Sequence, residues 1–93
     1  MKKQKEETFK ERYGIKYALQ YKVDPKFITA LIARESSFNR KAVSSSKAKG
    51  LGQIKALNFP ALGITDPFDI KQNVKGCVTY FSKMLGQWKG KDN

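Results

Sequence analysis

The sequence predicts a small all-α domain of about four helices. Its 93 residues are enough for one domain, near the size at which a single core stabilises only modestly. Apolar residues make up 40% and aromatic residues 12%, which favours a packed core over a disordered chain. Apolar side chains recur at helical intervals, and no long alternation of Val, Ile and Thr indicates a strand.

The first helix is expected over residues 8–21, after a charged segment at 1–7. Gly14 lowers the helix propensity of this stretch, but its apolar residues fit one helical face: Phe9, Tyr13, Ile15, Tyr17, Ala18 and Leu19. The second helix is expected over residues 25–38, because Asp24 suits the N-cap and Pro25 the first helical position.

Residues 39–49 are rich in Ser and Lys and are interpreted as a loop. Residues 50–59 are expected to form a short helix that is opened by its glycines and stopped before Pro60. The last helix is expected over residues 67–85, with Asp66 or Asp69 near its cap. These elements make one domain over residues 8–88, followed by a polar tail at 89–93.

Composition restricts the chemistry that this chain can perform. The chain has no histidine and one cysteine, which excludes an internal disulfide, a Cys/His zinc site, and Ser-His-Asp or Cys-His catalysis. An enzyme of this composition would use a carboxylate as its proton donor. The net charge of +11 suits polyanions such as nucleic acid, anionic lipid or an acidic wall polymer, and equally suits simple solubility. No apolar run approaches a membrane span, and no signal peptide is evident.

Glu35 is the acidic residue whose position demands an explanation. It continues the spacing of Ile28, Leu31 and Ile32 at i, i+3, i+4 and i+7, so the four share one helical face. One reading is a solvated residue paired with an arginine such as Arg34. The other is a buried carboxyl kept protonated at the negative end of a helix, as general-acid cleavage of a glycosidic bond requires.

Four motifs carry a family resemblance. They are Glu-Ser-Ser-Phe-Asn at residues 35–39, Ala-Val-Ser at 42–44, Gly-Leu-Gly-Gln at 50–53 and the segment DPFDIKQNVKGCVTYFSKML at 66–85. Together they resemble the catalytic domain of the lysozyme-like soluble lytic transglycosylases, of the glycoside hydrolase family 23 type. The resemblance covers about residues 13–86 and implies a small lysozyme-like helical fold.

The resemblance implies a specific reaction, with Glu35 as the single catalytic acid. Glu35 would protonate the oxygen that links N-acetylmuramic acid (MurNAc) to N-acetylglucosamine (GlcNAc), and its carboxylate would then act as the base. The C6 hydroxyl of the muramic sugar would attack its own C1 and leave a 1,6-anhydro end. Because this nucleophile is intramolecular, no second carboxylate is needed to activate water.

The resemblance also implies the residues that contact sugar: Ser44, Gln53, Asn73 and Tyr80. Three other roles stay open, namely Ser44 in a turn, Gln53 as a helix cap, and Tyr80 facing the core. Phe38 is expected to pack beneath the motif.

The implied partner is the glycan strand of peptidoglycan, and neither a metal nor another cofactor is expected. We expect a monomer in the periplasm or cell envelope that can associate with a membrane or an envelope complex. Three alternative functions remain: a hydrolytic lysozyme using Asp66 or Asp69 as second carboxylate, a non-catalytic wall-binding fragment, and a basic nucleic-acid-binding helical module.

The sequence departs from the family pattern at several positions. Lys47 replaces a glycine, Gly52 replaces a methionine, and Gly76 comes one residue before an expected glycine whose position Cys77 holds. Nothing matches the family's Ala-Tyr-Asn-Ala-Gly segment, so the C-terminal part of the family fold is expected to be missing.

Overall fold

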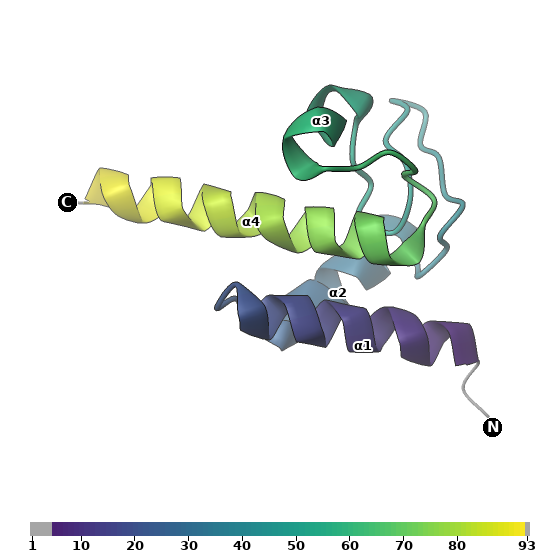
Figure 1. Ribbon diagram of the computed structural model, residues 1–93, viewed down its shortest axis with the longest axis horizontal. Coiled ribbons are helices and arrows are strands. Elements are labelled where there is room, and N and C mark those ends of the chain that lie inside the picture. The colour runs from purple at the N-terminus through teal and green to yellow at the C-terminus, as the bar shows by residue number, and fades with distance from the viewer. Residues whose placement is uncertain (1–4, 93) are drawn as a thin grey trace.

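The computed structural model describes residues 5–92, with side chains at residue 10 and residues 12–85. Within that range the chain forms four α-helices and one short 3₁₀ helix, and its only β-pairing consists of isolated bridges in the loop after α2. Figure 1 shows α1 (Lys5–Gln20) and α4 (Ile70–Asp92) lying beside each other, with α2 (Pro25–Ser36) packed against α1. The prediction of a small all-α domain with about four helices is confirmed.

The start of α2 follows the prediction, and its end does not. The Asp24 carboxylate accepts a hydrogen bond from the Lys26 backbone N–H at 3.0 Å, and Pro25 occupies the first turn. The helix ends at Ser36 because Ser37 and Phe38 both take left-handed backbone conformations, with φ of 52° and 61°. The expected end at Phe38 is therefore wrong by two residues.

The segment after the loop does not form the expected short helix. Gly50 and Gln53 adopt positive φ angles of 79° and 52°, so residues 50–53 form a turn rather than the start of a helix. A 3₁₀ helix, η1 (Ala56–Asn58), then leads into α3 (Phe59–Leu62). Pro60 lies inside the first turn of α3, where backbone N–H groups make no hydrogen bond within the helix, so a proline there costs no such bond. The prediction of a stop before Pro60 is wrong.

Helix α4 begins later and ends later than expected. The Asp69 carboxylate accepts a hydrogen bond from the Gln72 backbone N–H at 2.9 Å, which stabilises the first turn. Asp66 instead accepts from the Phe68 N–H at 3.0 Å, within the preceding turn. The helix continues to Asp92, so the polar tail expected from residue 89 is helical.

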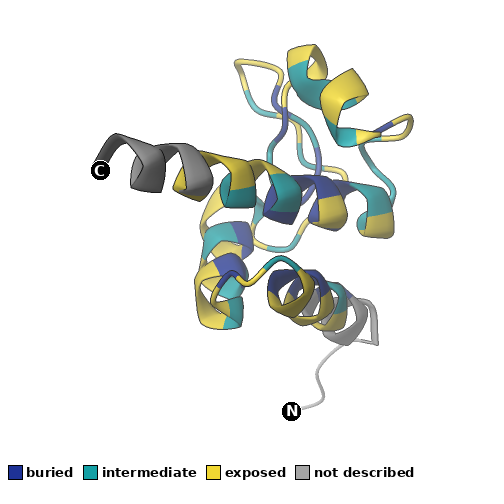
Figure 2. Cartoon of the chain, turned by 60° about the vertical axis from the view of Figure 1, so that its left-hand side comes forward, coloured by how far each residue is buried: buried dark blue, intermediate teal, exposed yellow. Residues whose placement is uncertain are grey.

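Two buried clusters hold these elements together, and both use α4. The larger joins α1 and α2 to α4 and includes Tyr17, Ala18, Ile28, Ile32, Val74 and Val78. The smaller joins the connecting segments to α4 through Ile54, Ile64 and Cys77. Figure 2 shows the corresponding dark blue faces of the helices turned inward.

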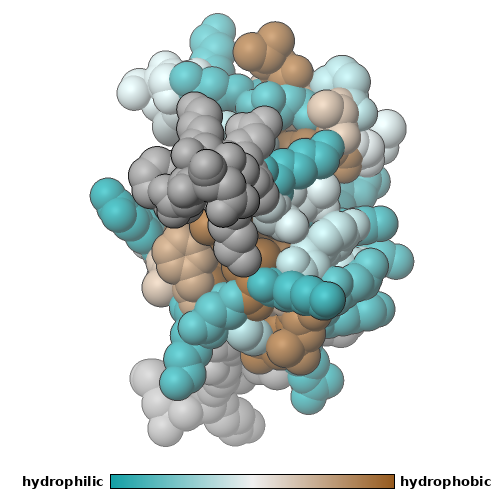
Figure 3. Space-filling model, turned by 90° about the vertical axis from the view of Figure 1, so that its left-hand side faces the viewer, coloured by the Kyte–Doolittle hydropathy of each residue, from teal (hydrophilic) through white to brown (hydrophobic). Residues whose placement is uncertain are grey.

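The surface mixes hydrophobic and hydrophilic side chains. Figure 3 shows brown hydrophobic areas divided by teal hydrophilic groups on the face that carries the C-terminal end of α4. Phe27, Tyr80, Met84 and Leu85 are among the exposed large side chains. Among the described residues, no helix combines the length and the apolar character that crossing a bilayer requires.

Candidate active site

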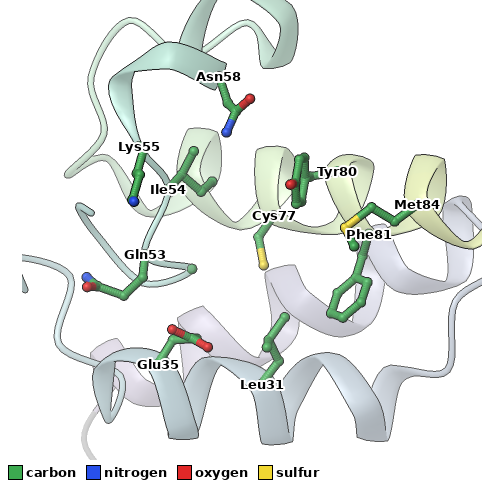
Figure 4. Close-up of a pocket in the computed structure, with 11 residues that line it drawn as sticks. Leu31, Glu35, Gln53, Ile54, Lys55, Asn58, Cys77, Tyr80, Phe81 and Met84 are labelled. Carbon is green, nitrogen blue, oxygen red and sulfur yellow. The ribbon is translucent and has the colours of Figure 1, made fainter. Parts of the chain in front are cut away.

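A pocket of about 430 Å³ lies where α2, α4 and the segment after residue 51 meet (Figure 4). Its lining residues come from these three elements: Leu31 and Glu35 from α2, Gly52, Gln53, Ile54, Lys55 and Asn58 from the segment, and Cys77, Tyr80, Phe81 and Met84 from α4. Its volume falls within the range typical of ligand pockets.

Glu35 stands in the last turn of α2 and is exposed at this pocket. Of the two readings left open from the sequence, the buried carboxyl does not fit, because the apolar face of α2 divides. Ile28 and Ile32 enter the core, whereas Leu31 and Glu35, four residues apart, line the pocket. Within residues 10–85, no hydrogen bond or ion pair engages the Glu35 carboxylate, which leaves it available to a ligand.

Cys77 lies at the base of the same pocket and is 4% exposed. Burial raises the pKa of its thiol to about 12, and the nearby negative charge of Glu35 adds to the effect. A thiol with such a pKa stays protonated at neutral pH and is a poor nucleophile. Of these two neighbouring acidic groups, the Glu35 carboxyl is therefore the one suited to exchange a proton with a substrate.

The backbone that follows Glu35 is held by a lysine that the sequence analysis did not identify. The ammonium group of Lys10 on α1 donates a hydrogen bond to the carbonyl oxygen of Phe38, and Lys10 is only 4% exposed. A cation there is favourable because the C-terminal end of a helix carries partial negative charge. No motif marks Lys10, since it stands in a charged stretch among several similar lysines.

Asn73 holds the turn that forms one wall of the pocket. Its amide nitrogen donates to the carbonyls of Pro67 at 2.8 Å and Lys49 at 3.0 Å, and its amide oxygen accepts from the Gly52 N–H at 2.7 Å. The side chain is 1% exposed and does not line the pocket. A direct sugar contact does not fit this placement; the geometry instead makes Asn73 a residue that positions the turn.

Gln53 and Ser44, both expected to contact sugar, are placed differently. Gln53 lines the pocket, and its amide nitrogen donates to the carbonyls of Gly50 at 2.9 Å and Ala42 at 3.2 Å. Among the residues whose side chains the structure describes, none donates to the amide oxygen of Gln53, which leaves it available to a ligand. The Ser44 hydroxyl accepts from the Ala48 N–H at 3.1 Å and does not line the pocket, which agrees with the turn reading.

Tyr80 and Phe38 complete the set of residues singled out from the sequence. Tyr80 is 44% exposed and lines the pocket from α4, so the alternative of a core-facing Tyr80 does not fit. Phe38 is partly buried and packs against the larger cluster, as expected. The structure therefore brings Glu35, Gln53 and Tyr80 to one pocket.

Comparison with known proteins decides the family. A family model described as the transglycosylase SLT domain matches residues 12–93. This chain belongs to that family. The resemblance found in the sequence is thereby confirmed.

Several curated relatives carry matching names. This SLT domain is 36% identical over 69 residues to the membrane-bound lytic murein transglycosylase F of Desulfosudis oleivorans, and the match covers 74% of the chain and 15% of the relative. It is 35% identical over 69 residues to the transglycosylase of Enterobacteria phage PRD1, covering 74% of the chain and 26% of the relative. Over 39 residues it is 59% identical to the membrane-bound lytic murein transglycosylase E of Buchnera aphidicola, covering 42% of the chain and 18% of the relative. The chain thus spans a quarter or less of the length of most of these relatives.

Two departures of this SLT domain from the family pattern have a common steric explanation. A Cβ atom added at Gly52 would lie 2.7 Å from the Cβ and 2.8 Å from the Sγ of Cys77. These distances are too short for real contacts, so Cys77 requires a glycine opposite it. The resemblance implied a methionine at position 52 and a glycine at position 77, so the large and the small residue stand here in the reverse order.

The third departure carries strain. Lys47 adopts a φ of 67°, a left-handed conformation that glycine takes far more readily than lysine. The glycine that the resemblance implied at this position would suit the same backbone.

Proposed function

We propose that this SLT domain is the catalytic part of a peptidoglycan lytic transglycosylase that cleaves the MurNAc-β-1,4-GlcNAc bond and forms 1,6-anhydro-MurNAc. The observation that carries this proposal is the Glu35 carboxyl, exposed in a pocket whose lining contains no second carboxylate. The names of the relatives, lytic murein transglycosylases E and F, support the same activity.

In the proposed reaction, protonated Glu35 donates its proton to the glycosidic oxygen as the bond from that oxygen to C1 of MurNAc breaks. The leaving GlcNAc keeps that proton as its 4-hydroxyl hydrogen. The C6 hydroxyl oxygen of the same MurNAc then bonds to C1, and its proton passes to the Glu35 carboxylate. The acid is regenerated, and no water is consumed. Tyr80 and the free amide oxygen of Gln53 supply hydrogen-bonding groups for the sugars.

Hydrolysis by inversion is less well supported by this pocket. An inverting glycosidase needs a second carboxylate about 6.5–9.5 Å from the acid, with room for water between them. The two downstream candidates, Asp66 and Asp69, accept hydrogen bonds from the Phe68 and Gln72 backbone N–H groups and do not line the pocket.

The test replaces Glu35 with glutamine, which keeps the shape of the side chain and removes the proton donor. Glu35→Gln is expected to lower the release of anhydro-muropeptides from purified cell walls by about 10²–10⁴-fold, measured by mass spectrometry. Asp66→Asn, which alters a carboxylate outside the pocket and keeps an acceptor for its turn, should stay within about twofold of the wild type.

Two results would contradict the proposal. Equal wall digestion by the wild type and Glu35→Gln would remove Glu35 from the chemistry. Products with reducing muramic ends and no anhydro form would show hydrolysis, and with it a lysozyme.

A further inference from the structure

Lys55 is the one basic side chain in the lining of the pocket, and the proposed reaction gives it no role. It comes from the segment that faces α2, so the pocket carries one negative group, Glu35, on its α2 wall and one positive group on the facing wall (Figure 4). Asn58 lines the same wall three residues later. The other members of the lining set are uncharged.

The backbone around Lys55 is fixed although its side chain is exposed. The preceding residue, Ile54, is buried and exchanges two backbone hydrogen bonds with Lys49, at 2.9 and 3.0 Å. The Lys55 carbonyl accepts from the Asn58 N–H at 2.9 Å, which closes the 3₁₀ turn. The Lys55 side chain therefore projects from a rigid base, so the direction in which it leaves the backbone is set before a ligand arrives, and its ammonium group can adjust to that ligand.

The Lys55 ammonium group also has no partner among the described residues. In the part of the chain whose side chains the structure describes, no hydrogen bond, ion pair or cation–π contact engages it. Lys10, in contrast, is buried and bonded to the Phe38 carbonyl, and Lys16 and Lys75 lie over the ring of Tyr17. Lys55 thus differs from these lysines in facing a pocket and having no partner there.

The proposed substrate presents a matching anion near the bond that Glu35 would protonate. MurNAc differs from GlcNAc by a lactyl ether that ends in a carboxyl group. In the cell wall this carboxyl group either is free or forms an amide with a peptide that carries carboxylates of its own. An ammonium group binds carboxylates by charge-assisted hydrogen bonds, and an amide N–H donor such as that of Asn58 can add a further bond.

We propose that Lys55, assisted by Asn58, binds a carboxylate of the lactyl–peptide substituent of MurNAc and so makes this pocket select muramic glycan over neutral GlcNAc polymers. The inference rests on the proposed function for the identity of the substrate, but it concerns binding rather than bond cleavage. The apolar residues at the other side of the pocket, Leu31, Phe81 and Met84, suit the C–H faces of the sugar rings.

The experiment measures binding in the Glu35→Gln background, so that no ligand is consumed. Three soluble probes are titrated by calorimetry: peptide-bearing glycan fragments, the same fragments stripped of peptide by an amidase, and a GlcNAc hexamer. Lys55→Met keeps an unbranched side chain one atom shorter and removes the charge. It is expected to weaken binding of at least one muramic probe by about fivefold, to leave the hexamer within about 1.5-fold, and to be rescued by Lys55→Arg.

The matched control is Lys71→Met, which removes one exposed lysine of α4 that does not line the pocket. It should change all three affinities by less than about 1.5-fold, which separates a local effect from a change in net charge. Loss confined to the stripped probe would assign the lactyl carboxylate, and loss confined to the peptide-bearing probe would assign a peptide carboxylate.

Equal weakening of all three probes by Lys55→Met, or no change for both muramic probes, would overturn the inference. Neither result depends on turnover. If the active chain releases anhydro products while Lys55→Met binds normally, this inference fails and the proposed function stands. If the active chain releases no product while the binding pattern holds, the proposed function fails and the inference about binding stands.

Discussion

The contact between Gly52 and Cys77 gives a quantitative test of how the pocket is packed. Gly52→Ala places a Cβ atom 2.7 Å from the Cys77 Cβ, 2.8 Å from its Sγ and 3.2 Å from the Oδ1 of Asn73. Cys77 stands on a helix, and Asn73 is fixed by three hydrogen bonds, so neither can withdraw easily. Overpacking of this kind costs typically about 1–3 kcal/mol, and we expect the upper part of that range.

The reciprocal substitution, Cys77→Gly, removes both atoms that would clash. Alone it should cost about 0.3 kcal/mol in helix propensity, because cysteine is itself a poor helix former, and about a further 1 kcal/mol in lost burial. In the double variant the new methyl group of residue 52 occupies the space that Cys77 has left. The double variant should therefore be more stable than the sum of the two single changes predicts, by about 1–2 kcal/mol.

Urea unfolding followed by circular dichroism measures the four free energies of this cycle. Gly14→Ala is the matched control, because its Cβ atom on α1 would make an ordinary contact with the Cγ2 atom of Ile28 on α2, at 3.4 Å. That variant should gain about 0.5–1 kcal/mol from helix propensity. If Gly52→Ala unfolds like the wild type, or if the cycle is additive within about 0.5 kcal/mol, the steric argument is refuted.

Three further predictions follow from single residues. Lys47→Gly should relieve the left-handed backbone and stabilise the domain by about 1 kcal/mol, seen as a Tm rise of about 4–8 °C; a fall in Tm would contradict it. Asn73→Ala leaves the Gly52 N–H and the Pro67 carbonyl without a partner among the described residues and removes one of the two hydrogen bonds to the Lys49 carbonyl. It should cost about 3 kcal/mol in urea unfolding, and a loss below about 1 kcal/mol would argue against its role. Because burial raises the Cys77 pKa from 9.0 to about 12, iodoacetamide near pH 8 should alkylate the folded chain about a thousandfold more slowly than the urea-unfolded chain, and equal rates would refute this. The free energy of unfolding should also fall above pH 9, because only the unfolded chain loses the thiol proton there.

The features that the sequence predicted well have local physical causes. The start of α2 depends on Asp24 and Pro25, which act within one turn of themselves. The apolar repeat of α4 identified a helix whose buried face includes Val74 and Val78. The motifs led to Glu35, and the family comparison agrees with the resemblance that they carried.

The features that the sequence did not predict depend on partners distant in the chain. Glu35 is exposed because α4 and the turn leave a pocket opposite it, and no spacing within α2 encodes that opening. The Asn73 side chain bonds to a turn 21 residues earlier and is buried there, and no spacing within α4 encodes that partner. Lys10 reaches the carbonyl of Phe38 across 28 residues.

The three hydrogen bonds of Asn73 also bear on the order of folding. They join α4 to Lys49, Gly52 and Pro67, so one side chain closes chain segments that are 6, 21 and 24 residues away. The turn at residues 50–53 gains these bonds only when α4 has docked, since closing such loops costs entropy that local contacts there do not offset. The wall of the pocket and the packing of α4 should accordingly form and melt as one cooperative unit, and the Gly52 amide should exchange its hydrogen only through opening of that unit.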